Sequence, residues 1–197
     1  MSADGERRAS AERTTKETSV RATIGLDGPG SAKVDTGIPF FDHMLSQLGT
    51  HAGFDLEVHA RGDLEVDAHH TVEDVGLALG RAFADALGDK AGIRRFASIS
   101  VPLDEALVDV ALDLSGRAFV VHEVPVPAEQ IGAYDPGLTE DFVRAFATEA
   151  GITLHVRLRD GRSPHHIVEA EFKALAKALG DATRLTGAIT PSTKGTL

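Results

Sequence analysis

The chain has 197 residues, with 30 acidic against 20 basic side chains, nine histidines and no cysteine. A net charge of −10 argues against binding to a nucleic-acid backbone, and the lack of cysteine excludes disulfides, thiolate metal sites and cysteine nucleophiles. No apolar run is long enough to cross a membrane, and the polar N-terminus does not look like a secretory signal, so we expect a cytoplasmic globular protein.

Apolar periodicity divides the first half of the chain into strands and helices. Residues 1–16 carry no periodic apolar pattern and predict a disordered, mobile N-terminal tail. Alternation over 18–26 and 54–58 predicts two strands, and helical spacing over 38–48 and 72–88 predicts two helices.

The second half of the chain repeats this order. Strands are expected at 99–101, 107–114, 118–124 and 152–156, and helices at 142–146 and 167–180. We therefore predict an α+β fold of two duplicated half-domains, 17–92 and 93–190, each a mixed sheet with helices on one face.

An internal repeat supports the duplication. His69-His70-x-Val72-Glu73 recurs as His165-His166-x-Val168-Glu169, a displacement of 96 positions (from 69 to 165). Upstream, Ala52-Gly53 recurs as Ala150-Gly151, displaced by 98 (from 52 to 150). Two halves related by a pseudo-two-fold axis would place these residues in equivalent environments.

The repeated motif has a geometry that suits metal binding. On a helix, His69 and Glu73 are four residues apart and lie on one face, while His70 points in another direction. Two copies suggest two metal ions, each with ligands from both halves or from neighbouring subunits. Imidazoles and carboxylates without thiolate suit Mn, Fe, Co, Ni or Zn.

Five further histidines are ambiguous from the pattern alone. His43 lies in an amphipathic helix and is either a third ligand or a helix-face histidine without a partner. His155 alternates with two apolar strand residues and is either a ligand or an exposed strand histidine. The others, which offer no spacing argument, are His51, His59 and His122.

Three short segments combine cations or hydroxyls with turn residues: Arg94-Arg95, Gly116-Arg117 and the C-terminal residues 191–197. Hydroxyl groups, exposed backbone N–H groups and a lysine suit a phosphate monoester. We therefore predict a small phosphorylated substrate, with 191–197 as a C-terminal phosphate-binding segment.

Eight motifs in a fixed order carry a resemblance to a known family: RxTKET at 13–18, GIPFFDHML at 37–45, HHTVEDVG at 69–76, VPLDEAL at 101–107, SGR at 115–117, TLHV at 153–156, HHIVEAEFK at 165–173 and PSTKG at 191–195. From Arg13 to the C-terminus the chain closely resembles the imidazoleglycerol-phosphate dehydratases of histidine biosynthesis, in their monofunctional form.

The resemblance implies a fold related to the second domain of ribosomal protein S5. It also implies a lyase that uses two Mn²⁺ per active site, in a large cage-like homo-oligomer with active sites between subunits. By motif, the metal ligands are His43, His69, His70, Glu73, His155, His165, His166 and Glu169. The substrate-binding positions are Glu17, Gln47, Arg95, Arg117, Ser192 and Lys194.

For the reaction, we expect Glu17, Glu73 and Glu169 to be the catalytic carboxylates, with proton transfer assigned to Glu17 and a metal-bound carboxylate or water. The imidazole ring of the substrate would act as electron sink through an imidazolate, diazafulvene-like intermediate. Two other readings remain open: a structural protein whose metal sites only join subunits, and a dinuclear phosphoesterase.

Overall fold

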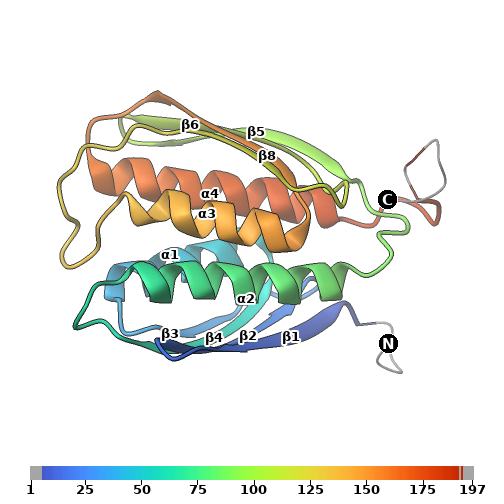
Figure 1. Ribbon diagram of the computed structural model, residues 1–197. Helices are drawn as coiled ribbons and strands as arrows, with labels where there is room; N and C mark the ends of the chain where they lie inside the picture. The colour runs from blue at the N-terminus through green and yellow to red at the C-terminus, as the bar shows by residue number, and fades with distance from the viewer. Residues whose placement is uncertain (1–5, 191, 193–197) are drawn as a thin grey trace.

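The computed structural model describes residues 6–190 and Ser192, which form two four-stranded sheets enclosing two pairs of helices. Figure 1 shows four layers in the order sheet, helix pair, helix pair, sheet. The apolar core lies between each sheet and its helices and between the two helix layers.

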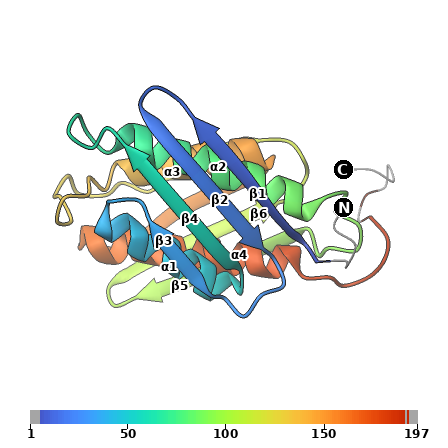
Figure 2. The same cartoon turned by 90° about the horizontal axis from the view of Figure 1, so that it is seen from below.

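The first half of the fold contains β1 (Arg8–Thr14), β2 (Thr18–Gly25), β3 (Ala32–Asp35), α1 (Pro39–Ala52), β4 (Asp55–Gly62) and α2 (His69–Leu87). Its sheet has the order β1-β2-β4-β3, in which β3 is parallel to β4 and the other pairs are antiparallel (Figure 2).

The second half contains β5 (Phe96–Leu103), β6 (Ala106–Asp113), β7 (Phe119–Glu123), α3 (Leu138–Ala150), β8 (Thr153–Asp160) and α4 (Pro164–Thr183). Its sheet repeats the topology as β5-β6-β8-β7, again with one parallel pair. The predicted duplicated α+β fold, with helices on one face of each mixed sheet, is confirmed.

Strand alternation explains why each sheet covers helices on one side only. In β2, Val20, Ala22 and Ile24 are buried while the residues between them are more exposed. In β6, Val108 and Val110 occupy the matching inward positions. Since side chains alternate across a strand, one face of each sheet is apolar and packs on helices.

The mobile-tail prediction is wrong for Arg8–Thr14, because these residues form β1, and each of them pairs with a residue of β2. The first half therefore begins before residue 17. The predicted boundary between residues 92 and 93 falls between α2 and β5. Residues 1–5, 191 and 193–197 lie outside the described part of the chain, and so does the predicted phosphate ligand Lys194.

The helix layers join the two halves crosswise: α2 packs on α3, and α1 packs on α4. Two glycines bring α2 close to α3, since a Cβ on Gly76 would lie 2.9 Å from the Phe142 carbonyl oxygen and one on Gly80 would lie 2.5 Å from that of Phe146. Each helix that carries an HH motif thus contacts a helix of the other half. Among the described residues, no helix is long and apolar enough to span a membrane.

Candidate active site

The two HH motifs lie at the beginning of α2 and α4, and both helices begin at the end of the molecule opposite the termini (Figure 1). The first turns are built locally. An oxygen of Asp67 accepts the backbone N–H of His69 at 2.8 Å. Ser163 caps α4 by accepting the N–H of His166, and Pro164 occupies the first helical position.

At the start of α4, one carboxylate lies between two imidazoles. Glu169 Oε2 is 3.1 Å from His165 Nε2 and 3.7 Å from His43 Nε2, so α1 supplies a donor to the second copy of the motif. Burial alone would raise the pKa of Glu169, but the hydrogen bond and charge of Lys173, whose Nζ lies 2.7 Å away, keep it below its ordinary value. The carboxylate is therefore ionised and ready to bind a cation.

The start of α2 has a related but different arrangement, in which one histidine lies between two carboxylates. His69 Nε2 lies 4.0 Å from Glu73 Oε2, and His69 Nδ1 lies 3.2 Å from Asp141 Oδ2 at the first turn of α3. Counted back from the matched helix ends Ala52 and Ala150, Asp141 is the counterpart of His43. The sequence prediction did not include Asp141, because the repeat was traced through identical residues.

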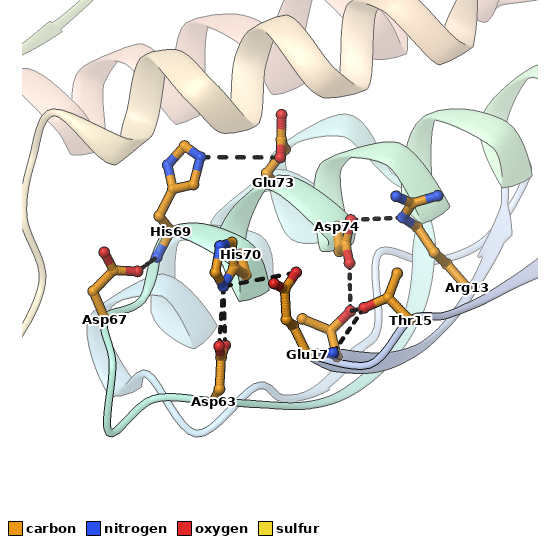
Figure 3. Close-up of polar contacts among 10 residues, drawn as sticks. Arg13, Thr15, Glu17, Asp63, Asp67, His69, His70, Glu73 and Asp74 are labelled. Carbon is orange, nitrogen blue, oxygen red and sulfur yellow. Dashed lines mark hydrogen bonds and ion pairs between the residues drawn. The ribbon is translucent and has the colours of Figure 1, made fainter.

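The second histidine of each motif is held by a carboxylate through Nδ1. His70 Nδ1 lies 3.1 Å from Asp63 Oδ2, with Glu17 Oε2 at 4.0 Å (Figure 3). The hydrogen bond with Asp63 is the largest cause of the raised pKa of His70. A carboxylate on Nδ1 orients the ring and leaves Nε2 for another partner, as outer carboxylates do in metal sites.

In the second half, Glu105 performs this role. His166 Nδ1 lies 2.7 Å from Glu105 Oε2, and that contact raises the pKa of His166. Glu105 also accepts the backbone N–H groups of Ser163 and Arg162. These bonds, first that of Ser163 and then that of His166, lower the pKa of Glu105 to about 2.

The structure does not bring His155 together with the other predicted ligands. It lies on β8 between Ala111 of β6 and Val121 of β7, and among the described residues no polar contact joins it to the HH motifs. In the described part of a single chain, no group of three or more His, Asp or Glu side chains is arranged to hold a metal ion. One chain therefore presents partial donor sets.

The predicted substrate residues fall into two groups. Glu17 lies at the HH end of the molecule, and so does Gln47, whose Nε2 is 3.5 Å from His43 Nε2. Arg95 lies at the other end, where its backbone N–H donates to the Ala182 carbonyl near the end of α4. His166 precedes Ala182 by 16 residues (from 166 to 182), or roughly 24 Å of helix.

The Arg95 guanidinium is fixed by Asp113, with Nε at 2.6 Å and Nη2 at 3.0 Å from its two oxygens, and this bidentate contact raises the pKa of Arg95. Arg117 is exposed beyond β6, where its backbone N–H donates to Ser115 Oγ. Ser192 lies beyond the C-terminal end of α4 in the sequence. The anion-binding candidates therefore gather away from the histidines of the same chain.

Comparison with known proteins identifies the family. A sequence model described as imidazoleglycerol-phosphate dehydratase matches residues 36–179. The imidazoleglycerol-phosphate dehydratase of Acidothermus cellulolyticus is 59% identical over 97% of this chain and 93% of that protein. The chain belongs to the imidazoleglycerol-phosphate dehydratase family. It is therefore an enzyme, a hydro-lyase, as the motifs predicted.

Other members support this assignment. The imidazoleglycerol-phosphate dehydratase of Frankia casuarinae is 55% identical over 97% of this chain and 99% of that protein. The crystal structure of the Staphylococcus aureus N315 dehydratase superposes with a TM-score of 0.82 at 33% identity, covering 92% of this chain and 99% of that one. The Pyrococcus furiosus enzyme in complex with (S)-C348 also gives 0.82, at 34% identity over 94% and 99%.

Proposed function

We propose that this chain dehydrates imidazoleglycerol phosphate to imidazole-acetol phosphate in histidine biosynthesis, at active sites that two or more copies of the chain build together. The observation that carries the proposal is the separation of Arg95 from the HH motifs. A substrate of this size cannot contact Arg95 and His166 of one chain at once, since roughly 24 Å of α4 separates their surroundings. In the proposed site, one copy of the chain provides the HH motifs and a second copy provides Arg95.

The residues fit a divalent metal by their chemistry. Imidazole nitrogens and carboxylate oxygens, with no thiolate in the chain, suit Mn²⁺, and the two second histidines already have oriented rings. The donors proposed to hold two Mn²⁺ are those that the motifs imply, with Asp141 orienting His69: His43, His69, His70, Glu73, His155, His165, His166 and Glu169. Among the described residues of one chain, no polar contact joins His155 of β8 to the other seven donors, so its place in the set follows from the motif.

Bound Mn²⁺ supplies Lewis-acid polarisation of the imidazole ring of the substrate. The residues of the chain perform the remaining tasks. Glu17, whose side chain is 56% exposed beside His70, is placed to take and return protons. Arg95, held rigid by Asp113, and Arg117 bind the phosphate and align the glycerol chain for loss of water. Ser192 and Lys194 are assigned to the same phosphate site because the C-terminal motif implies it, and Lys194 lies outside the described residues.

Shared sites require an assembly. If each copy contributes its HH motifs to one site and its anion-binding residues to another, the copies can close into a cage-like homo-oligomer. In this proposal each site needs residues from more than one copy, so assembly and activity are coupled.

The deciding experiment supplies imidazoleglycerol phosphate with Mn²⁺ and follows imidazole-acetol phosphate together with free phosphate. The dehydratase forms the ketone and releases no phosphate. A phosphoesterase releases phosphate, and a structural metal protein does neither, so either of these results would overturn the proposal. Arg95→Ala should raise KM strongly, whereas Arg81→Ala, which removes an exposed arginine paired with Asp85 on α2, should not.

A further inference from the structure

The hairpin between β1 and β2, which carries Glu17, is fastened to α2 by a side chain outside the proposed metal and substrate sets. We infer that Asp74 is a positioning residue, which holds this hairpin against α2 so that the Glu17 carboxylate stays beside His70. The inference rests on the proposed function, in which Glu17 transfers protons.

Asp74 ties the two strands of the hairpin together at its closed end. Its side chain is only 8% exposed, and Oδ1 accepts a hydrogen bond from Arg13 Nε of β1 at 2.6 Å. Its other oxygen accepts the hydroxyl hydrogen of Thr18, the first residue of β2. Figure 3 shows this carboxylate between α2 and the hairpin. A buried carboxylate with two such bonds fixes both strands relative to α2.

The turn beyond this contact is closed by Thr15. Its hydroxyl oxygen accepts the backbone N–H of Glu17 at 3.1 Å and that of Thr18 at 3.0 Å. The backbone of Glu17 is therefore fixed, although its side chain is largely exposed. The sheet also lies close to α2 here, because a Cβ on Gly62, the β4 partner of Thr18, would lie 2.1 Å from Thr71 Oγ1.

The second half lacks this clamp. The 96-position shift places Ala170 at the counterpart of Asp74. There the glutamate of the hairpin, Glu105, anchors its own turn by binding His166 and the loop before α4. In the first half Asp74 anchors the hairpin and Asp63 binds His70. The Glu17 carboxylate is therefore not needed for either contact.

The test compares Asp74→Asn with Asp85→Asn in the Mn²⁺-loaded enzyme. Asp85 forms an exposed ion pair with Arg81 on the same helix, so its variant controls for loss of one acidic charge from α2. We expect Asp74→Asn to speed hydrogen exchange of the 13–18 backbone at least about 10-fold. Its kcat should fall roughly 10- to 100-fold, because the catalytic group is misplaced. KM and bound Mn²⁺ should not change.

A second variant, Arg13→Gln, removes the more exposed partner and keeps the buried carboxylate, so it tests the clamp if Asp74→Asn folds poorly. Normal exchange of residues 13–18 in both variants would overturn the inference. Faster exchange with unchanged kcat would overturn it as well. If the unaltered enzyme fails to dehydrate imidazoleglycerol phosphate, the proposed function falls, while the exchange result still decides whether Asp74 holds the hairpin.

Discussion

Glu17 and Glu105 occupy equivalent positions, each directly before the second strand of its sheet, yet their carboxylates have different surroundings. Glu105 binds His166 at 2.7 Å and two backbone N–H groups. Glu17 lies 4.0 Å from His70, whose Nδ1 is already bound by Asp63. One member of the pair orients a histidine, and the other remains available for chemistry.

This difference predicts opposite defects in two matched variants. Glu17→Gln should lower kcat by about 10²- to 10⁴-fold and leave bound Mn²⁺ unchanged, since it removes only a proton-transfer group. Glu105→Gln should weaken Mn²⁺ binding about 10- to 100-fold, because His166 loses its orienting carboxylate, and kcat should recover at saturating Mn²⁺. Steady-state kinetics over a Mn²⁺ titration measures both. Similar defects in the two variants would contradict the assigned roles.

Shared active sites predict that two inactive variants rescue each other. A chain with Glu17→Gln keeps Arg95, and a chain with Arg95→Ala keeps Glu17. If one site takes Glu17 and Arg95 from different copies, dissociating and reassembling an equal mixture restores about a quarter of the sites by random pairing. Activity of the reassembled mixture is the measurement, and each variant reassembled alone is the control. No gain over the separate variants would mean that each site lies within one chain.

Asp141 should support metal binding on the His69 side, because its carboxylate contacts Nδ1 and orients the ring. Asp141→Ala should weaken binding of one of the two Mn²⁺ ions about 10-fold or more, because His69 loses this orienting carboxylate. Asp141→Asn, whose amide oxygen can still accept a hydrogen bond from Nδ1, should weaken binding less. Equilibrium dialysis with metal analysis measures the affinity, and Glu149→Gln on the exposed side of α3 is the control. Unaltered binding in Asp141→Ala would remove this residue from the site.

Removal of the metal should break the assembly. In the part of one chain that the structure describes, no three donors are arranged to hold a metal ion, so in the proposed assembly the ions take ligands from several copies and thereby join them. Chelation should therefore shift the particle to smaller species in size-exclusion chromatography with light scattering, and Mn²⁺ should restore it. A particle of unchanged mass after complete metal removal would show that coordination is not shared.

His122 predicts a pH dependence of folding. Its side chain is 4% exposed, with Nε2 2.8 Å from the buried Glu171 and Nδ1 3.5 Å from Glu140. Burial would lower the pKa of His122, but the two glutamates outweigh burial and the opposing charge of Arg144, so it is raised. The stabilisation is therefore complete below the unfolded-state pKa of about 6.5 and is lost as pH rises through the folded-state pKa.

His122→Ala should therefore lower the free energy of unfolding by roughly 3–5 kcal/mol at pH 6, since Glu171 is left buried without its partner. The difference from the unaltered chain should shrink as the pH rises through the raised folded-state pKa of His122. Denaturant unfolding of the metal-free protein at a series of pH values from about 6 upward measures the free energy of unfolding of both chains. His59→Ala, which removes an exposed histidine beside Asp35, is the control. A pH-independent difference would mean that His122 is neutral in the fold.

Strongly periodic segments were predictable from the sequence, and weakly apolar ones were not. The helix over 72–88 became α2, because its apolar spacing reflects the face that packs on the sheet. In contrast, β1 is an edge strand whose residues are all exposed or half-buried, so it carries little apolar alternation. The four-residue β3 is too short to show a period.

For the site, the repeat located both HH motifs but not Asp141. Sequence matching finds a counterpart only when the residue type is kept, whereas His43 and Asp141 share a place in the fold and differ in type. The separation of Arg95 from the motifs also needed the structure, because it follows from the direction in which α4 and β5 run.

The crosswise packing of the helices has a consequence for how such a chain arose. The His43–Glu169 pair joins α1 to α4, and the His69–Asp141 pair joins α2 to α3, so each pair connects one helix from each half. An ancestor with a single half would have met these partners only on a second molecule. We infer that fusion of two copies would turn such a contact between molecules into one within a chain, after which the halves could differ, as they do at His43 and Asp141 and in how Asp74 and Glu105 anchor their hairpins.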